Sequence, residues 1–290
     1  MLPPPRSWAL ERNDRRLGFA RAAGITLFAE SRGYGVAWHT HPAWKIVLAL
    51  GEEDGRSGGG EQSGRLGGGE EGGRLGGGEE DVRPGGGEEY GGPGAGGRGA
   101  ISVSVAGGRA IRAPGVIVPP LVRHASASSA GFVALFLDPW ALPPGFPLTP
   151  LDPTAVRRAL AALGPGAAEP GRGTPDLAAA RAEIAALAGP GRVPDPRVAH
   201  AVRRSGGARF LADVAAEVGL SPPRLRALVR EEAGVPLVRL RAWERLRDAV
   251  ARLGAAPVAP AAADAGFADQ AHLTRTARAL IGRTPATFRP

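Results

Sequence analysis

Two short stretches near the C-terminal end of the chain decide the fold: residues 266–275 read GFADQAHLTR, and residues 282–289 read GRTPATFR. Gly266 and Phe267 end a run of small residues, and Asp269 is placed to cap a helix that follows. Apolar residues at helical spacing would form the inner face of this helix, while its outer face carries Gln270, His272, Thr274 and Arg275. The pattern predicts two helices joined by a tight glycine turn.

A similar arrangement precedes it, where residues 208–234 read ARFLADVAAEVGLSPPRLRALVREEAG. Gly219 permits a sharp turn, Ser221 is suited to cap the next helix, and Pro222 takes the first helical position. A longer helix predicted from Pro236 to Leu253 joins the two units. Helix, glycine turn and helix is the helix-turn-helix pattern, whose second helix enters the major groove of DNA.

The paired units and the endings GFADQAHLTR and GRTPATFR resemble the DNA-binding domain of AraC/XylS-type transcriptional regulators over roughly residues 194–290. The resemblance implies two recognition helices that reach successive major-groove segments about 34 Å apart. The residues expected to read bases are Pro223, Arg226, Ala227, Gln270, Ala271, Thr274 and Arg275. Phosphate contacts, which position without specifying, are expected from Arg224, Arg230 and His272.

Four positions depart from the family pattern. Ala227 stands where the family usually has Arg, and Val229 and Ala277 stand where it usually has Phe. Pro260 falls inside the small-residue helix of the second unit. Because position 227 lacks Arg, we expect Arg226 to read bases in its place in the first unit. We expect the second unit to contribute more of the sequence specificity.

The composition is uneven along the chain, which has 290 residues, 45 glycines, no cysteine and a net charge of +8. Residues 51–100 hold 23 of the glycines in a nine-residue repeat and carry 11 acidic against 5 basic residues. Glu follows the glycines where a calcium-binding roll needs Asp, so we interpret the repeat as a disordered insert. The remaining chain has a net charge of +14, and residues 201–290 carry 15 Arg against 8 acids, which favours a nucleic-acid partner.

The N-terminal part reads as short strands separated by Gly and Pro, including residues 25–30, 36–41, 100–107 and 131–139. Helical patterns start at Asp152-Pro153, Thr174-Pro175 and Asp195-Pro196. We therefore expect an α+β multidomain chain, in which a small β-sandwich or barrel is followed by helices. The predicted divisions are a sensor domain over 1–145, a helical connector over 146–192 and an all-α DNA-binding domain over 193–290.

Three of the five histidines fall in the predicted strands: His39 and His41 in WHTHPAWK, and His124 in VPPLVRH. A His-x-His pair on one strand points both rings to one face, and a later His would complete a three-ligand site. This resembles the cupin barrel and the sensor domain of many AraC-type regulators, over roughly residues 20–145. Lys45 or Ile46 occupies the place of the family's Glu ligand. Three interpretations stay open: a divalent metal site, an effector pocket, or histidines with structural hydrogen bonds.

Several classes are excluded or disfavoured. Without cysteine the chain has no disulfide framework, zinc finger or thiol nucleophile, and it fits a reducing cytoplasm. No secretory signal and no run of 18 apolar residues are present. The predicted function is a cytoplasmic, non-enzymatic transcriptional regulator with double-stranded DNA, RNA polymerase, a small-molecule effector and a second copy of the chain as partners. The alternatives are a metal-dependent cupin enzyme fused to a DNA-binding tail, and a degraded regulator.

Overall fold

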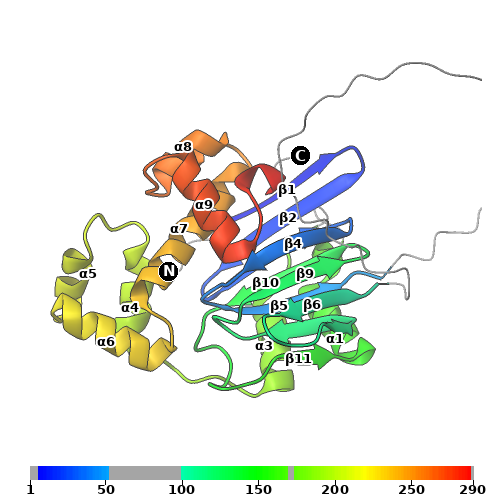
Figure 1. Ribbon diagram of the computed structural model, residues 1–290, viewed down its shortest axis with the longest axis horizontal. Helices are drawn as coiled ribbons and strands as arrows, with labels where there is room; N and C mark the ends of the chain where they lie inside the picture. Colours follow the sequence, from blue (N-terminus) through cyan, green and yellow to red (C-terminus); the bar gives the residue numbers. More distant parts are fainter. Residues whose placement is uncertain (1–5, 52–98, 169–172, 289–290) are drawn as a thin grey trace, which may run out of the picture. The chain divides into compact units, whose positions relative to one another are not determined.

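The computed structural model describes residues 6–51, 99–168 and 173–288 (Figure 1). Most of the predicted glycine-rich insert over 51–100 lies outside these residues. Eleven strands come first: β1 Arg6–Arg12, β2 Arg15–Ala22, β3 Ile25–Glu30, β4 Tyr34–His39, β5 Trp44–Ala49, β6 Ile101–Val105, β7 Ile111–Ala113, β8 Gly115–Val118, β9 His124–Ser128, β10 Phe132–Leu137 and β11 Thr149–Leu151.

The helices follow the strands in the sequence. They are α1 Pro153–Leu163, α2 Pro165–Ala168, α3 Leu177–Ala188, α4 Pro196–Ser205, α5 Leu211–Glu217, α6 Pro222–Ala233, α7 Leu237–Leu253, α8 Val258–Asp264 and α9 Gln270–Ile281, with a final 3₁₀ turn, η1, at Pro285–Phe288. No helix in the described ranges is both long and apolar enough to cross a bilayer.

The strands form two antiparallel sheets and not a closed barrel, which corrects the barrel half of the sequence prediction. One sheet has seven strands in the order β1-β2-β3-β10-β5-β8-β11, and the other has four in the order β4-β9-β6-β7. Among the described residues no strand is paired into both sheets, so the ladder does not close. The sandwich-like alternative is the better description.

Two apolar clusters lie on opposite faces of the seven-stranded sheet. Alternate residues of β5 and β10 point to opposite sides, so Ile46 and Leu135 pack with α1 and α3, while Val47 and Ala134 belong to the cluster that includes α7 and α9. A third cluster fills the space between α4, α5, α6 and the start of α7. The sheet thus lies between the connector helices and the C-terminal helices.

The predicted helix starts agree with the caps that the structure shows. Asp152 accepts hydrogen bonds from two backbone amides at the start of α1, and Asp195 does so from one amide of α4. The predicted start at Thr174-Pro175 is displaced, because Asp176 is the cap and α3 begins at Leu177. Pro260 lies in the first turn of α8, where backbone N–H groups have no carbonyl partner within the helix, so the missing N–H of proline does not interrupt it.

Candidate nucleic-acid interface and buried histidine cluster

The first helix-turn-helix unit consists of α5 and α6. Gly219 between them has φ +67°, a left-handed conformation that favours glycine, and Ser221 caps α6 with a bond from the Arg224 amide at 3.4 Å. The inner face of the unit is buried and consists of Val214, Ala215, Leu225, Leu228 and Val229. The predicted contact residues are all exposed on α6: Pro223, Arg224, Arg226, Ala227 and Arg230. Their DNA-binding roles stay predictions.

The second unit consists of α8 and α9, and it repeats the same local rules. Gly266 has φ +79°, and Asp269 accepts a 2.6 Å bond from the His272 amide at the start of α9. Phe267, Leu273, Ala277 and Leu280 are buried inside the unit, as the sequence pattern predicts.

The outer face of α9 forms a shallow depression lined by Gln270, Ala271, Thr274, Arg275 and Arg278. Four of these are the residues that the sequence predicts to read bases from α9. The sequence pattern does not single out Arg278, although it lies one turn after Arg275 on the same face. His272 is half-buried against the edge of Phe267, with ring centroids 5.2 Å apart, and therefore lies beside this face.

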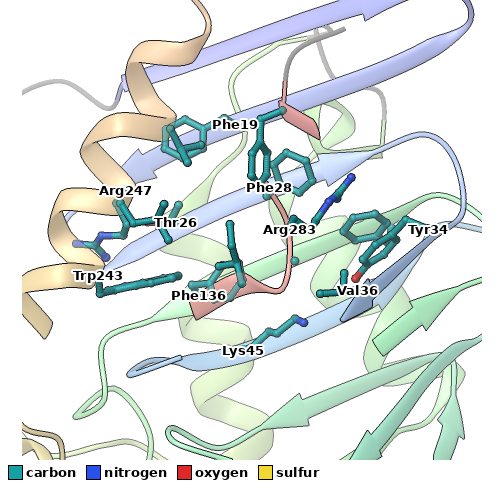
Figure 2. A pocket seen from close by; sticks show the side chains of 16 residues that line it. Phe19, Thr26, Phe28, Tyr34, Val36, Lys45, Phe136, Trp243, Arg247 and Arg283 are labelled. Atoms are coloured by element: carbon teal, nitrogen blue, oxygen red, sulfur yellow. The ribbon is translucent and has the colours of Figure 1, made fainter. Parts of the chain in front are cut away.

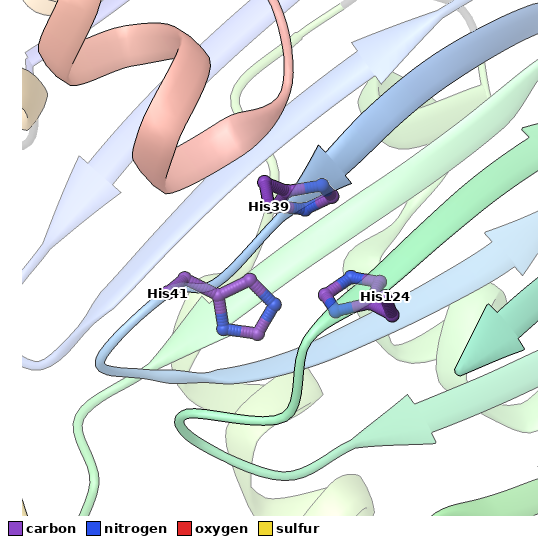
Figure 3. Close-up of side chains that lie close together, drawn as sticks. All are labelled: His39, His41 and His124. Atoms are coloured by element: carbon purple, nitrogen blue, oxygen red, sulfur yellow. The ribbon is translucent and has the colours of Figure 1, made fainter. Parts of the chain in front are cut away.

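The histidines of the N-terminal part lie together (Figure 3). His39 ends β4 directly opposite His124, the first residue of β9, and His41 follows two residues later. The ring centroids of His39 and His124 are 4.2 Å apart, and those of His41 and His124 are 5.0 Å apart. One nitrogen from each ring lies within 4.8 Å of the other two, and all three residues are buried.

The outward hydrogen bonds of the rings determine which nitrogen is free. The Nδ1 atoms of His39, His41 and His124 lie 2.7, 2.7 and 2.9 Å from the backbone oxygens of Ala37, Ala43 and Val122. Each Nδ1 therefore donates its hydrogen, which leaves a lone pair on each Nε2. The Nε2 atoms of His39 and His41 are buried and have no hydrogen-bond partner among the described residues. Such backbone-anchored imidazoles are the usual arrangement of metal-binding histidines.

Burial keeps the three rings neutral. Desolvation, followed by the charge of Lys45, lowers the pKa of His39 to about 2 and that of His124 to about 3. Desolvation also lowers the pKa of His41 well below its ordinary value, and the charge of His124 adds to it. The neutral form is the one that binds a metal ion.

Lys45 occupies a place at which the cupin pattern predicts a Glu ligand. It is buried, and its Nζ donates to the Ser126 hydroxyl at 3.1 Å and lies 3.4 Å from the Nε2 of His124. Its neighbour Ile46 points to the opposite face of the sheet. Desolvation and then the charge of Arg283 lower the pKa of Lys45 to about 7.

Thr40 lies between His39, the last residue of β4, and His41. It contacts two helices, α7 and α9. Its amide donates to the Ala279 carbonyl of α9 at 3.1 Å, and its hydroxyl oxygen accepts a 3.0 Å bond from the Nη2 of Arg239 on α7. The end of α9 also rests on β4 (Figure 1). The His-x-His segment is therefore linked by hydrogen bonds to the joining helix α7 and to α9.

Comparison with known proteins agrees with this architecture. A family model described as a helix-turn-helix domain matches residues 214–290, and no curated protein matches the chain. A single-substitution variant of apo ToxT from Vibrio cholerae is 9% identical, with a TM-score of 0.50, and the match covers 92% of this chain and 97% of that one.

Two smaller matches each cover part of the chain. The C-terminal domain of AraT, a response regulator from Geobacillus stearothermophilus, is 22% identical over 34% of this chain and 87% of its own, with a TM-score of 0.31. An RmlC-like cupin from Shewanella frigidimarina is 11% identical over 46% of this chain and 84% of its own, with a TM-score of 0.24. Residues 214–290 match an AraC-type helix-turn-helix domain, and the chain as a whole has the fold of ToxT.

Proposed function

We propose that this protein is a sequence-specific DNA-binding transcriptional regulator. The observation that carries the proposal is the pair of capped, exposed helices α6 and α9 within the segment that matches the helix-turn-helix model. Both outer faces hold donors suited to DNA, since arginine reads guanine and glutamine reads adenine in the major groove. The excess of Arg over acidic residues in 201–290 supplies the attraction to phosphate.

The roles of single residues follow their position on these helices. We propose that Arg226, with Pro223 and Ala227, reads bases from α6, and that Gln270, Ala271, Thr274 and Arg275 do so from α9. Arg224, Arg230 and His272 contact phosphates in this proposal. A cytoplasmic location, a homodimer and contact with RNA polymerase complete it, and it assigns no catalytic step.

The test is selection of binding sites from random duplex DNA, followed by gel-shift titration of the selected site. Arg275→Ala is expected to relax base preference at one position, whereas Arg157→Ala, an exposed arginine on α1, is the matched control and leaves it unchanged. Failure to select any sequence, or a preference that survives Arg275→Ala, contradicts the assignment of α9 as a recognition helix.

We further propose that His39, His41 and His124 hold a divalent metal ion that controls the DNA-binding helices. Support comes from three neutral rings that each offer one nitrogen within 4.8 Å of the others, and from the Nε2 atoms of His39 and His41, which have no hydrogen-bond partner among the described residues. The three histidines would hold an ion of the zinc or nickel type, whose charge would keep the three rings in place. Lys45 opposes it, because its Nζ lies 3.4 Å from one ligand atom.

Metal content of protein purified without chelators tests this site. We expect nearly one ion per chain, a loss of it in His41→Asn, and no loss in His200→Asn, whose ring is partly exposed beside Glu217. Lys45→Met is expected to raise metal affinity, because it removes a neighbouring cation. Absence of bound metal, together with no uptake of added zinc, nickel, iron or manganese, would exclude the metal site and leave the DNA-binding proposal intact.

A further inference from the structure

Within the described part of the chain, the two helix-turn-helix units belong to separate apolar clusters. Leu237 and Leu240, in the first turns of α7, pack in the cluster of α5 and α6. Trp243 and Leu246, further along the same helix, pack in the cluster of α8 and α9. The boundary between the two clusters falls at Arg241. Apolar packing therefore attaches each unit to its own part of α7 and leaves the contact between the units to polar residues.

The second half of α7 is fixed against the seven-stranded sheet. Trp243 and Arg247 project from α7 toward the sheet, and Trp243 lines a cavity of about 60 Å³ together with Ala134, Phe136 and Phe288 (Figure 2). The ring centroids of Trp243 and Phe136 are 5.1 Å apart. This side of the joining helix thus keeps its position relative to the sheet.

Arg241 and Arg245 lie on the side of α7 that is turned away from the sheet, since side chains two positions apart on a helix differ by about 200°. The Nη2 of Arg241 donates to the carbonyls of Ala208 and Arg209 at 2.6 and 3.1 Å. Arg245 donates from Nε to the Gly206 carbonyl at 3.0 Å and from Nη2 to the Ala208 carbonyl at 3.4 Å. The two arginines therefore hold the loop that leads from α4 into the first unit.

The guanidinium of Arg245 also lies against the second unit. Gly266 forms the turn between α8 and α9, and a Cβ at this position would lie 3.3 Å from the Nε and 3.5 Å from the Cζ of Arg245. Glycine is therefore favoured at position 266 twice, by φ +79° and by the space that the guanidinium takes. Arg245 thus lies between the loop that enters the first unit and the turn of the second.

The two arginines are held by backbone carbonyls and not by carboxylates. Within the described ranges neither forms an ion pair, and the buried Nε of Arg241 has no hydrogen-bond partner. Desolvation and then the charge of Arg241 lower the pKa of Arg245. Carbonyls at the C-terminal end of α4 carry the negative end of its dipole, which offsets part of this cost. The arrangement uses the planar fork of arginine, which bonds several acceptors at once.

We propose that Arg245, supported by Arg241, is a positioning residue that fixes the first helix-turn-helix unit against the second and thereby sets the spacing between the two DNA segments that the units read. One added base pair turns a segment by about 34° and moves it by about 3.4 Å, which two rigidly joined helices cannot follow. The effect on DNA spacing rests on the proposed DNA-binding function, whereas the fixed orientation of the units does not.

Distance measurement between spin labels tests the orientation without DNA. The chain has no cysteine, so Ala216→Cys on α5 and Ala263→Cys on α8, both at exposed positions, place one label in each unit. We expect a single narrow distance distribution in the labelled parent and a distribution about twofold wider after Arg245→Ala, because the first unit loses an attachment to the second. An unchanged width would overturn the proposal.

Selection of binding sites from random duplex DNA tests the spacing. We expect the parent to select two segments at one spacing and to lose at least about tenfold in affinity when one base pair is inserted between them. Arg245→Ala is expected to select the same segments but to lose only about threefold on insertion. Arg203→Ala, which replaces an exposed arginine at the end of α4, is the control and keeps the parental loss.

The outcomes of this selection are distinguishable. Equal losses in the parent and in Arg245→Ala would overturn the proposal while leaving the DNA-binding function intact. Failure of the parent to select any sequence would contradict the DNA-binding function, and the spin-label widths would still decide the orientation of the units.

Arg245→Lys separates position from charge. Lysine keeps the positive charge, but its ammonium cannot bond the loop carbonyls and cover Gly266 as a planar guanidinium does. We expect this variant to behave as Arg245→Ala does, both in the width of the label distances and in the spacing test. Parental behaviour of Arg245→Lys would show that charge alone suffices and would overturn the positioning role.

The turn glycines of the two units give a test that retains Arg245. Gly219 and Gly266 have φ +67° and +79°, so alanine strains both turns alike. A Cβ at Gly219 would meet nothing within 4 Å, whereas one at Gly266 would press on Arg245. Gly266→Ala is expected to reduce the loss on insertion about twofold, and Gly219→Ala to leave it unchanged. Equal results in the two variants would overturn the role of Arg245.

Discussion

The two helix-turn-helix units are built by the same local rules but differ in what surrounds them. Helices α6 and α9 each have 12 residues, a side-chain cap at the start and a left-handed glycine with φ +67° at the end. α6 packs within the helical cluster of α4, α5 and the start of α7. The end of α9 rests on β4 and shares the Thr40 hydrogen bond with the histidine segment. Only the second unit thus contacts the histidine segment through its own recognition helix.

The difference suggests a division of labour between the units. The first presents three exposed arginines on α6 and has Ala at position 227, which suits attachment to phosphate more than base reading. The second presents Gln270 and Arg275 and touches the segment between His39 and His41. Specificity and control would then lie in the same unit.

The largest expected effect is on the acid stability of the metal-free chain, and it comes from the buried histidines beneath the second unit. Their pKa values are lowered by folding, so their stabilising contribution is complete above the unfolded value of 6.5 and is lost as the pH falls below it. While the rings stay neutral in the folded chain, each of them lowers the free energy of unfolding by about 1 kcal/mol for each pH unit below 6.5. In urea unfolding between pH 6.5 and about 3, His124→Asn is expected to reduce the slope of the unfolding free energy against pH by the contribution of one ring.

The control for this measurement lies beside the first unit. His200 on α4 is partly exposed and lies 2.9 Å from the Glu217 carboxylate of α5. His200→Asn is expected to leave unchanged the slope of the unfolding free energy against pH that the three buried histidines cause. An equal change of slope in both variants would show that burial under the second unit has no special effect.

Substitution of the glycines that end α6 and α9, Gly234 and Gly282, tests the contact of α9 with β4. Alanine at φ +67° costs about 1 kcal/mol in either helix. A Cβ at Gly282 would lie 2.8 Å from the Nδ1 of His39 and closer still to the Ala37 carbonyl, whereas a Cβ at Gly234 would meet nothing within 4 Å. Gly282→Ala should therefore destabilise by about 3 kcal/mol in urea unfolding, and Gly234→Ala by about 1. Equal losses would mean that α9 does not rest on β4 in solution.

Substitution of one arginine in each recognition helix compares their contributions to DNA binding. Arg275→Ala is expected to cost about 1–3 kcal/mol and to relax preference at one base pair. Arg226→Ala is expected to cost less and to cause a smaller loss of preference for selected over unrelated DNA, because Ala227 leaves the first unit without the family's arginine. Gel-shift titration against both kinds of DNA separates the outcomes, and a larger loss of preference in Arg226→Ala would reverse the division of labour.

Local chemistry made the helical half predictable, since caps at Ser221 and Asp269 and apolar spacing depend on a few neighbouring residues. The His-x-His pair and His124 could also be expected on one face, because side chains alternate along a strand. The two open sheets could not be read from the strands, since their pairing joins residues far apart in the sequence. The same reason hid the cavity, whose wall combines Ala134 with Phe288, and the inward position of Lys45, which the sequence showed only as the absence of a Glu ligand.

The smallest expected effect tests the hydrogen bond by which Thr40 links the histidine segment to Arg239 on α7. Thr40→Val keeps the shape of the side chain but removes the hydroxyl that accepts from Arg239, at a cost of about 1.5 kcal/mol, and Thr40→Ser retains that acceptor. If the histidine segment controls the second unit through Thr40, added zinc changes DNA affinity in the parent protein and in Thr40→Ser but less in Thr40→Val. Zinc uptake should be the same in all three proteins. Equal zinc responses would place the coupling elsewhere, and the remaining contact of the end of α9 with β4 would be the first alternative.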